Sequence, residues 1–286
     1  DDGSVVIDFG EGTDSEEEIE HDSNLAEFIE DDELESLANE LIEHFESDRS
    51  SRGEWANAYI KGMDLLGMKV EERTEPWNGA SGVYHPMMTE AVIKFQAQAM
   101  GELMPAAGPV RTKIMGKLTP EKFEQAQRVE TELNYLITEK MPDYRDEMEQ
   151  MLFKLPMAGS AFKKIYFDPI TERPVAQFVP AEDLVVSHGS SNLRTAPRFT
   201  HVMKRTSEEI LKLQVNGFYR DVELPEATKE ITDIEEKYNE LEGSDPTFSD
   251  DPRHTLLEMH VDLDLPEPFD DVDGVALPYV VTIDKS

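Results

Sequence analysis

Apolar residues near the start of the chain follow a helical spacing. Over residues 31–66 they stand at Leu34, Leu37, Leu41, Phe45, Trp55, Tyr59 and Leu66. A separation of three or four residues is typical of a helix with one buried face, so the pattern predicts one long helix over 31–66. Gly53 costs such a helix about 1 kcal/mol relative to alanine, and a break near residues 48–53 is the alternative.

Proline and capping signals indicate three further helices. Pro86 suits the first turn of a helix, Thr119 followed by Pro120 repeats that start signal, and Asp143 is a typical N-cap. We expect helices from 86 to just before Pro105, from 120 to just before Pro142, and from 144 to about 155. The second of these collects one apolar face, made of Phe123, Ala126, Val129, Leu133, Leu136 and Ile137.

The second half of the chain changes to strand-like patterns. Short apolar runs at 161–167 and 174–179 flank the turn signal Asp168-Pro169, which predicts a hairpin. Thr206 and Glu209 form a capping box for a short helix through residue 213. The remaining elements predicted are a strand at 198–205, a polar helix at 226–241, a strand at 254–265 in which apolar and polar residues alternate from Leu257 to Leu265, and a strand at 275–284.

We therefore expect an α+β fold with a helical N-terminal half followed by mixed strands and short helices. Three parts are anticipated: an acidic, disordered segment at 1–30, a mainly helical part at 31–158, and a mixed α/β part at 159–286. The final strand enters a polar turn at 284–286 with no returning strand after it. We accordingly expect the protein to continue beyond residue 286.

The negative charge is concentrated at the two ends of the chain. The formal net charge is -35; residues 1–48 hold twenty Asp and Glu and no Lys or Arg, and residues 221–286 hold twenty acids against four bases. Residues 49–220 hold twenty-three bases and twenty-two acids, so the body is nearly neutral. A groove-reading DNA-binding protein needs the opposite sign, whereas an acidic surface repels phosphates and lets DNA slide past.

Few residues carry a recognisable chemistry. The chain has no cysteine, which excludes disulfides and thiolate catalysis, and no apolar run long enough to span a membrane. The stretch NGASG at 78–82 lacks the lysine of a phosphate-binding loop and is interpreted as a turn, as is DDVDG at 270–274, which fails as an EF-hand loop. No histidine pair has metal-binding spacing. We expect no catalytic residue, cofactor or metal, and therefore not an enzyme.

The two tryptophans are interpreted first as packing anchors. Trp77 also has an alternative interpretation, because it stands beside the Asn78-Gly79 turn. Large aromatic residues in such places concentrate binding energy at interfaces, so Trp77 is the candidate subunit-contact residue.

Several segments together resemble the portal proteins of short-tailed bacteriophages. They are PWNGASGVYHP at 76–86, MTEAVIKFQAQAMGELMP at 88–105, GPVRTKIMG at 108–116, APRFTHVMKRTSEEILKL at 196–213, and HTLLEMHVDLDL with DGVALPYVVTIDKS near the end. No single motif is diagnostic, but their order and spacing are specific. The resemblance covers roughly residues 50–286, and the acidic residues 1–30 match nothing in the family.

The resemblance implies a structural subunit of a dodecameric ring at one capsid vertex, made in the host cytoplasm and carried in the virion. Its implied partners are further copies of itself, the major capsid and scaffolding proteins, the terminase large subunit, a tail adaptor protein and double-stranded DNA that passes without sequence-specific binding. It implies no membrane. This stretch would form most of the wing, with the stem, clip and crown largely beyond residue 286.

Two other classes of protein stay open. The twenty acids of residues 1–48 also suit an acidic interaction protein, such as a DNA mimic or scaffold, which would compete with DNA for a basic partner. A hydrolase that uses a carboxylate pair gains no support from any local motif, but sequence alone does not show which carboxylates meet in the fold.

Overall fold

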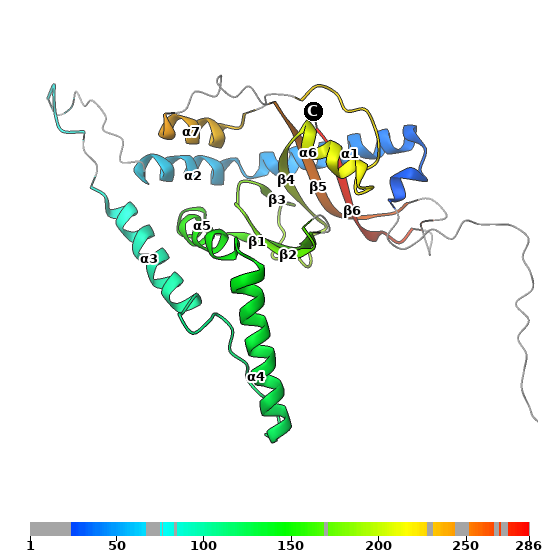
Figure 1. Cartoon of the computed structure of the whole chain (residues 1–286). Coiled ribbons are helices and arrows are strands. Elements are labelled where there is room, and N and C mark those ends of the chain that lie inside the picture. Colours follow the sequence, from blue (N-terminus) through cyan, green and yellow to red (C-terminus); the bar gives the residue numbers. More distant parts are fainter. Residues whose placement is uncertain are drawn as a thin grey trace, which may run out of the picture.

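The chain folds into a body of two sheets and several helices, from which two helices project. Figure 1 shows the computed structural model. It describes residues 24–66, 75, 77–82, 85–168, 171–227, 231–243, 252–265, 269 and 274–285. Most of the acidic segment expected at 1–30, and the acidic part of the loop at 270–274, lie outside these residues.

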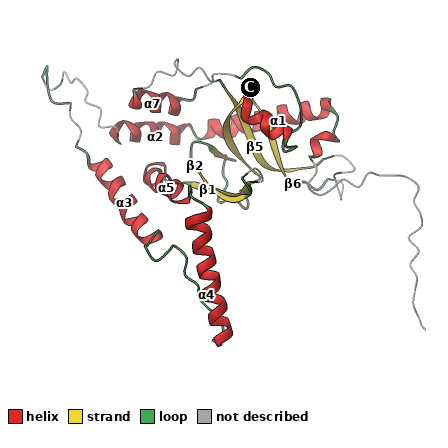
Figure 2. Ribbon diagram, viewed as in Figure 1, coloured by secondary structure: helices red, strands yellow, loops and turns green. Residues whose placement is uncertain are grey.

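The described residues contain helices and antiparallel strands, as the expected α+β class requires (Figure 2). The α-helices are α1 (Asp31–Ser51), α2 (Gly53–Leu66), α3 (Met87–Leu103), α4 (Pro120–Tyr135), α5 (Tyr144–Ala158), α6 (Ser207–Val215) and α7 (Asp233–Glu242). A short 3-10 helix, η1 (Leu25–Glu27), precedes α1, and a π-helical turn, η2 (Leu136–Lys140), continues α4. The strands are β1 (Phe162–Asp168), β2 (Arg173–Val179), β3 (Leu184–Val186), β4 (Arg198–Thr206), β5 (Arg253–Leu263) and β6 (Leu277–Asp284).

The prediction of one continuous helix over 31–66 is wrong by a single residue. Helix α1 ends at Ser51 and α2 begins at Gly53, so Arg52 interrupts the helix. Its guanidinium donates hydrogen bonds to the carbonyl oxygens of Ala181 (2.5 Å) and Leu184 (2.9 Å). The break therefore lies where the alternative placed it, and the side chain at the break ties both helices to the start of β3.

Two sheets form the β part of the body. Strands β1 and β2 make the predicted hairpin, and a four-stranded antiparallel sheet has the order β3-β4-β5-β6. Strand β3 was not predicted. Strand β6 pairs with β5 from Leu263 opposite Leu277 to Leu256 opposite Asp284. The last strand thus has a partner on one side and forms the edge of the sheet on the other.

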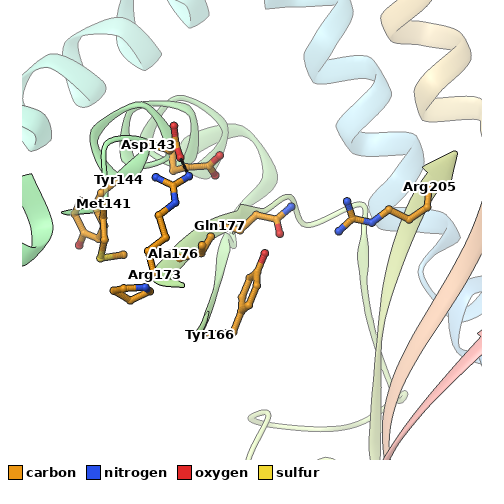
Figure 3. Close-up of a pocket in the computed structure, with 11 residues that line it drawn as sticks. Met141, Asp143, Tyr144, Tyr166, Arg173, Ala176, Gln177 and Arg205 are labelled. Atoms are coloured by element: carbon orange, nitrogen blue, oxygen red, sulfur yellow. Dashed lines mark hydrogen bonds and ion pairs between the residues drawn. The ribbon is translucent and has the colours of Figure 1, made fainter. Parts of the chain in front are cut away.

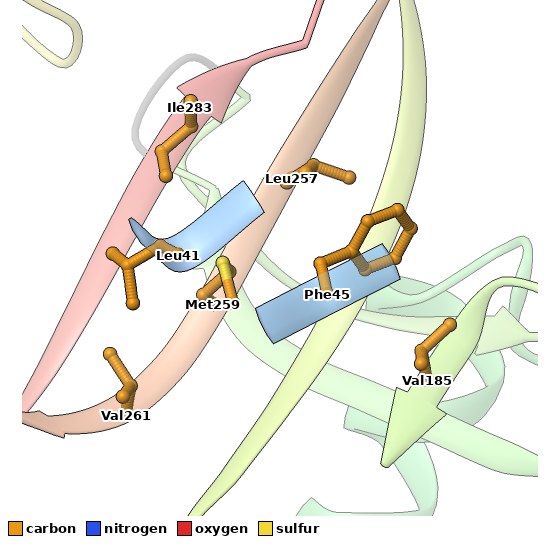
Figure 4. Packing of buried hydrophobic residues seen from close by; sticks show 7 residues of the cluster. All are labelled: Leu41, Phe45, Val185, Leu257, Met259, Val261 and Ile283. Carbon is orange, nitrogen blue, oxygen red and sulfur yellow. The ribbon is translucent and has the colours of Figure 1, made fainter. Parts of the chain in front are cut away.

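Helix α1 covers one face of the four-stranded sheet (Figure 4). Leu41 and Phe45 of α1 pack on a buried cluster from three strands that contains Val185, Leu257, Met259, Val261 and Ile283. The alternation predicted for β5 places these odd-numbered residues on the helix side, as expected. The other face of β5, which the alternation predicts to be exposed to solvent, is partly buried. His254 and Leu256 on that face are covered by the elements on the opposite side of the sheet.

A second core cluster joins α2, α5 and α7. Tyr59 and Met63 of α2 pack with Ala158 and Ile234, and Trp55 packs against the same cluster. The indole of Trp55 stacks on Tyr59 and donates a hydrogen bond of 3.0 Å to the carbonyl oxygen of Ala158. Trp55 is therefore a packing anchor, as predicted.

The helix predicted at 226–241 begins later than expected. Thr232 caps α7 with a full capping box to Glu235, so the first helical residue is Asp233. The capping box predicted for α6 is confirmed, since Thr206 accepts from the backbone of Glu209 while the Glu209 carboxylate accepts from the backbone of Thr206. A helix start follows the residue that satisfies its first N–H groups.

Candidate functional site

An arm that projects from the body carries exposed apolar side chains. We define the arm as residues 104–135, which comprise the segment after α3 together with α4 (Figures 1 and 2). Helix α3 packs against α5, whereas α4 contains no buried residue. The apolar face predicted for α4 is therefore only partly covered: Phe123, Val129 and Leu133 are exposed, and Ala126, Leu136 and Ile137 are half-buried.

The outer end of the arm carries large apolar side chains in solvent. Met115 is 79% exposed, Leu118 68% and Phe123 58%; these three residues are the arm tip. Lys113, Lys117 and Lys122 surround them, and none forms an ion pair with a described residue. Apolar side chains grouped at the end of a projection are typical of a surface that another molecule covers.

The segment that leads to the tip is held along α4 by side chains of the helix. Asn134 bonds both backbone groups of Val110, accepting from its N–H at 3.0 Å and donating to its carbonyl oxygen at 3.1 Å. The carboxylate of Glu130 accepts from both the N–H (3.1 Å) and the hydroxyl (3.0 Å) of Thr112. These bonds lower the pKa of Glu130. The arm is thus a two-layered rod of helix and extended chain.

Gly108 makes this close approach to the helix possible. Its φ of +99° lies in the region that favours glycine, and a Cβ placed there would stand 2.4 Å from Oδ1 of Asn134. A side chain at this position would therefore collide with the amide that holds Val110 in place.

The candidate contact residue Trp77 is also exposed. It lies in a turn closed by a hydrogen bond of 3.1 Å from the N–H of Ala80 to the carbonyl oxygen of Trp77, with Gly79 at φ +80°. The turn predicted at 78–82 is confirmed. The side chain is 66% exposed, so the interpretation of Trp77 as a core anchor is wrong, while its role as a subunit contact stays a prediction.

The sheet face opposite α1 carries a cluster of charged and polar groups. His201 of β4 lies opposite Glu258 of β5, and Lys164 from the β1–β2 hairpin places its Nζ 2.5 Å from each carboxylate oxygen of Glu258. Nε2 of His260 is 3.6 Å from Oε1 of Glu258, which is too long for a strong hydrogen bond. Lys164 is therefore the main partner of this carboxylate.

Both His201 and Glu258 have altered acidities. Burial, together with the nearby charge of Lys164, lowers the pKa of His201 to about 4. Burial alone would raise the pKa of Glu258, but neighbouring His260 and Lys164 outweigh that effect and bring it to about 2. At neutral pH the cluster therefore holds a neutral imidazole beside an ion pair.

A small pocket lies beside this cluster. It has a volume of about 260 Å³ and is enclosed by α5, the β1–β2 hairpin and Arg205 of β4 (Figure 3). Arg173 crosses it to form an ion pair of 2.8 Å with Asp143, and burial raises the pKa of Tyr166 on another wall. Pockets for drug-sized ligands usually have volumes of about 300–1,000 Å³, so this one suits a small polar species at most.

Three residues at one end of the sheet form a hydrogen-bonded relay that was not predicted. Ser207 Oγ is 3.1 Å from Nε2 of His254, and Nδ1 of His254 is 2.8 Å from Oδ2 of Asp284. We call these residues the relay. They come from the start of α6, the start of β5 and the end of β6. No local sequence motif predicts them. Ser207 and His254 are 47 positions apart and His254 and Asp284 are 30 positions apart, so they meet only through strand pairing.

The described residues contain no cluster of three or more potential metal ligands, and none of their helices is both long and apolar enough to cross a membrane. Comparison with protein-family models and with curated proteins found no match to the chain.

Proposed function

We propose that the chain is a subunit of a bacteriophage portal ring, the assembly through which DNA enters and leaves the capsid. The observation that carries the proposal is the arm tip: Met115 and Leu118 of the segment before α4 and Phe123 of α4 are each more than half exposed, and α4 contains no buried residue. The ordered motifs between residues 76 and 286 that resemble portal proteins support it as well.

The arm suits assembly better than an isolated monomer. Covering a large apolar side chain contributes on the order of 1.5–3 kcal/mol. Burial of the three exposed residues would therefore contribute a sizeable favourable free energy to association. A contact in which an arm meets a different surface of the next copy is heterologous, and heterologous contacts close into rings when the rotation permits. Under the proposal, the arms extend outward or sideways from the ring to reach neighbouring copies.

The acidic surface suits a channel for DNA. Acidic residues exposed along α1 include Asp32, Glu33, Glu35, Glu40 and Glu43. Surfaces of this sign repel the phosphate backbone and oppose tight, sequence-specific binding. Under the proposal, DNA passes without base-specific contacts, while the capsid, scaffolding, terminase and tail adaptor proteins bind other surfaces of the ring.

Electron microscopy and native mass measurement of the full-length protein test the proposal. We expect rings with a central hole, and we expect Leu118→Asp and Phe123→Asp to shift the population toward monomer by at least tenfold. Leu211→Asp on α6 is the matched control, because Leu211 is 57% exposed but lies away from the arm. Monomer alone under every assembly condition would refute the ring, and rings insensitive to both arm variants would refute the role of the arm.

The charge of residues 1–48 supports a second candidate, an acidic protein that binds the basic surface of a partner in place of DNA. Twenty acids without a single base make this stretch comparable to a polyanion. This candidate predicts a monomer or dimer that displaces duplex DNA from a basic DNA-binding protein in a competition assay. Failure to displace DNA at low salt would remove it.

A further inference from the structure

We propose that Ser207 is a nucleophilic serine, activated by His254 and Asp284, that cleaves small uncharged or cationic esters. This inference does not depend on the proposed function. It starts from the order of the relay, in which a hydroxyl, an imidazole and a carboxylate are joined by hydrogen bonds of 3.1 and 2.8 Å. The same order of groups activates serine in hydrolases of unrelated folds, which are recognised by geometry rather than by sequence position.

The carboxylate fixes which nitrogen of His254 can accept a proton. Asp284 in its ionised form can only accept hydrogen bonds, so Nδ1 of His254 carries the hydrogen that points at Oδ2. Nε2 is then the unprotonated nitrogen and accepts from the hydroxyl of Ser207. The imidazole thus faces the serine as a base.

The burial of His254 fixes the position of the base, whereas Ser207 is exposed to solvent. His254 is 2% exposed and lies on β5, an inner strand of the sheet, while the side chain of Asp284 on the neighbouring strand β6 is 10% exposed. A hydrogen bond of 2.9 Å from the N–H of Lys285 to the carbonyl oxygen of Thr255 ties the two strands beside the relay. Ser207 is exposed at the start of α6.

The first turn of α6 supplies donors for a developing negative charge. Its capping box occupies the N–H of Glu209 and the N–H of Thr206. The N–H groups of Ser207 and Glu208 donate to no described residue. They lie at the positive end of the helix dipole, and the N–H that follows a serine nucleophile is a common oxyanion donor.

The reaction balances without any cofactor. Ser207 Oγ attacks the carbonyl carbon of the ester while its proton passes to Nε2 of His254, and the oxyanion is held by the free N–H groups. The bond to the leaving oxygen breaks as His254 returns the proton, which releases the alcohol. Water, deprotonated by the same nitrogen, then cleaves the acyl-serine to the acid and restores Ser207.

The charge around Ser207 determines the substrate class. Glu208 and Glu209 follow it directly on the same turn. Each has a cation at 3.9 Å, Lys212 and Arg205 respectively, but exposed pairs of this length are weak, so the two carboxylates still disfavour anionic esters and phosphate groups. The open position of Ser207 offers little binding surface, which limits selectivity and keeps turnover slow. The substrates that we expect are therefore short acyl esters with uncharged or cationic leaving groups.

A fluorophosphonate probe tests the assignment on the full chain. We expect covalent labelling of the wild-type protein, located by mass spectrometry at Ser207, and hydrolysis of p-nitrophenyl acetate at a rate that depends on pH. Ser207→Ala removes the label and lowers the hydrolysis rate at least 100-fold, whereas Ser191→Ala, at another exposed serine, changes neither. Circular dichroism spectra show that each variant is folded.

Two further variants test whether Ser207 is labelled because the relay activates it or only because it is exposed. His254→Gln and Asp284→Asn keep Ser207 in place, and we expect each to slow labelling by at least tenfold and to flatten its dependence on pH. Absence of any label on wild-type protein, a label that survives in Ser207→Ala, or equal labelling of Asp284→Asn and wild type would each overturn the proposal.

Discussion

The ion pair between Arg198 and Asp48 gives the sharpest test of how the sheet is joined to α1. Nε of Arg198 is 2.6 Å from one carboxylate oxygen of Asp48, and its Nη2 is 3.0 Å from the other. The side chain of Asp48 is 7% exposed. It also lies in the last turn of α1, where the helix dipole disfavours negative charge. Arg198 is therefore needed to offset a carboxylate in an unfavourable place.

Arg198→Met removes the cation and leaves the buried carboxylate without its partner. Breaking a buried pair in this way costs about 3–5 kcal/mol. Because the side chain of Arg198 is 22% exposed, water partly replaces it and we expect the lower end, about 3 kcal/mol. With a urea m-value of about 3 kcal/mol/M for a chain of this size, the unfolding midpoint falls by about 1 M.

The assay is urea unfolding followed by circular dichroism, with a matched surface pair as control. Arg173→Met breaks the ion pair to Asp143, whose side chain is 65% exposed, and exposed pairs contribute under about 1 kcal/mol. The double variant Arg198→Met with Asp48→Leu should recover most of the loss, since no charge is then buried. Equal midpoints for the two arginine variants, or no recovery in the double variant, would refute this account of the join.

Three other predictions follow from the described contacts. The folded state keeps the pKa values of both His201 and Glu258 below their ordinary ones, so it binds fewer protons than the unfolded state. Stability that is present above pH 6.5 is then lost as the pH falls, first between about 6.5 and 4 through His201 and then between about 4.5 and 2 through Glu258. His201→Gln should flatten the first of these two steps. Urea unfolding midpoints that stay constant from pH 7.5 to 4 would contradict the prediction. Gly108→Ala should loosen the arm by driving the Asn134 amide away, seen as faster amide hydrogen exchange at Val110, whereas Gly101→Ala, with open space at its Cβ, should not. Thr232→Ala removes the cap of α7 and should cost about 1 kcal/mol in the free energy of unfolding; a change below 0.3 kcal/mol, roughly the error of the method, would show that the cap is not needed.

The elements that were predictable are those whose causes are local. Thr206 and Glu209 satisfy backbone groups within one turn, so the start of α6 follows from four residues of sequence. The alternation in β5 located its buried face in the same way. Strand β3 was missed because three residues carry no periodicity, and its pairing with β4 forms through tertiary structure.

The features that were missed depend on distant partners. The break at Arg52 is explained by carbonyl groups at least 129 positions away, and the relay joins three elements that only the sheet brings together. The apolar face of α4 was read correctly as apolar, yet periodicity reports which side chains share a face and not what covers it. The exposure of Trp77 was not predicted for the same reason, because an aromatic residue beside a turn can lie either in a core or on a surface.

The π-helical turn at the base of α4 affects where the tip of the arm can lie. Sixteen residues of α4 set the tip about 24 Å from this turn, at about 1.5 Å per residue. A π turn carries one residue more per loop than the regular helix and interrupts its hydrogen-bond ladder. A rotation of about 10° at η2 would carry the tip sideways by about 4 Å over that length. The arm is in this sense a lever. In the ring that we propose, such a change of angle would let the same chain reach neighbours at slightly different distances without refolding the body.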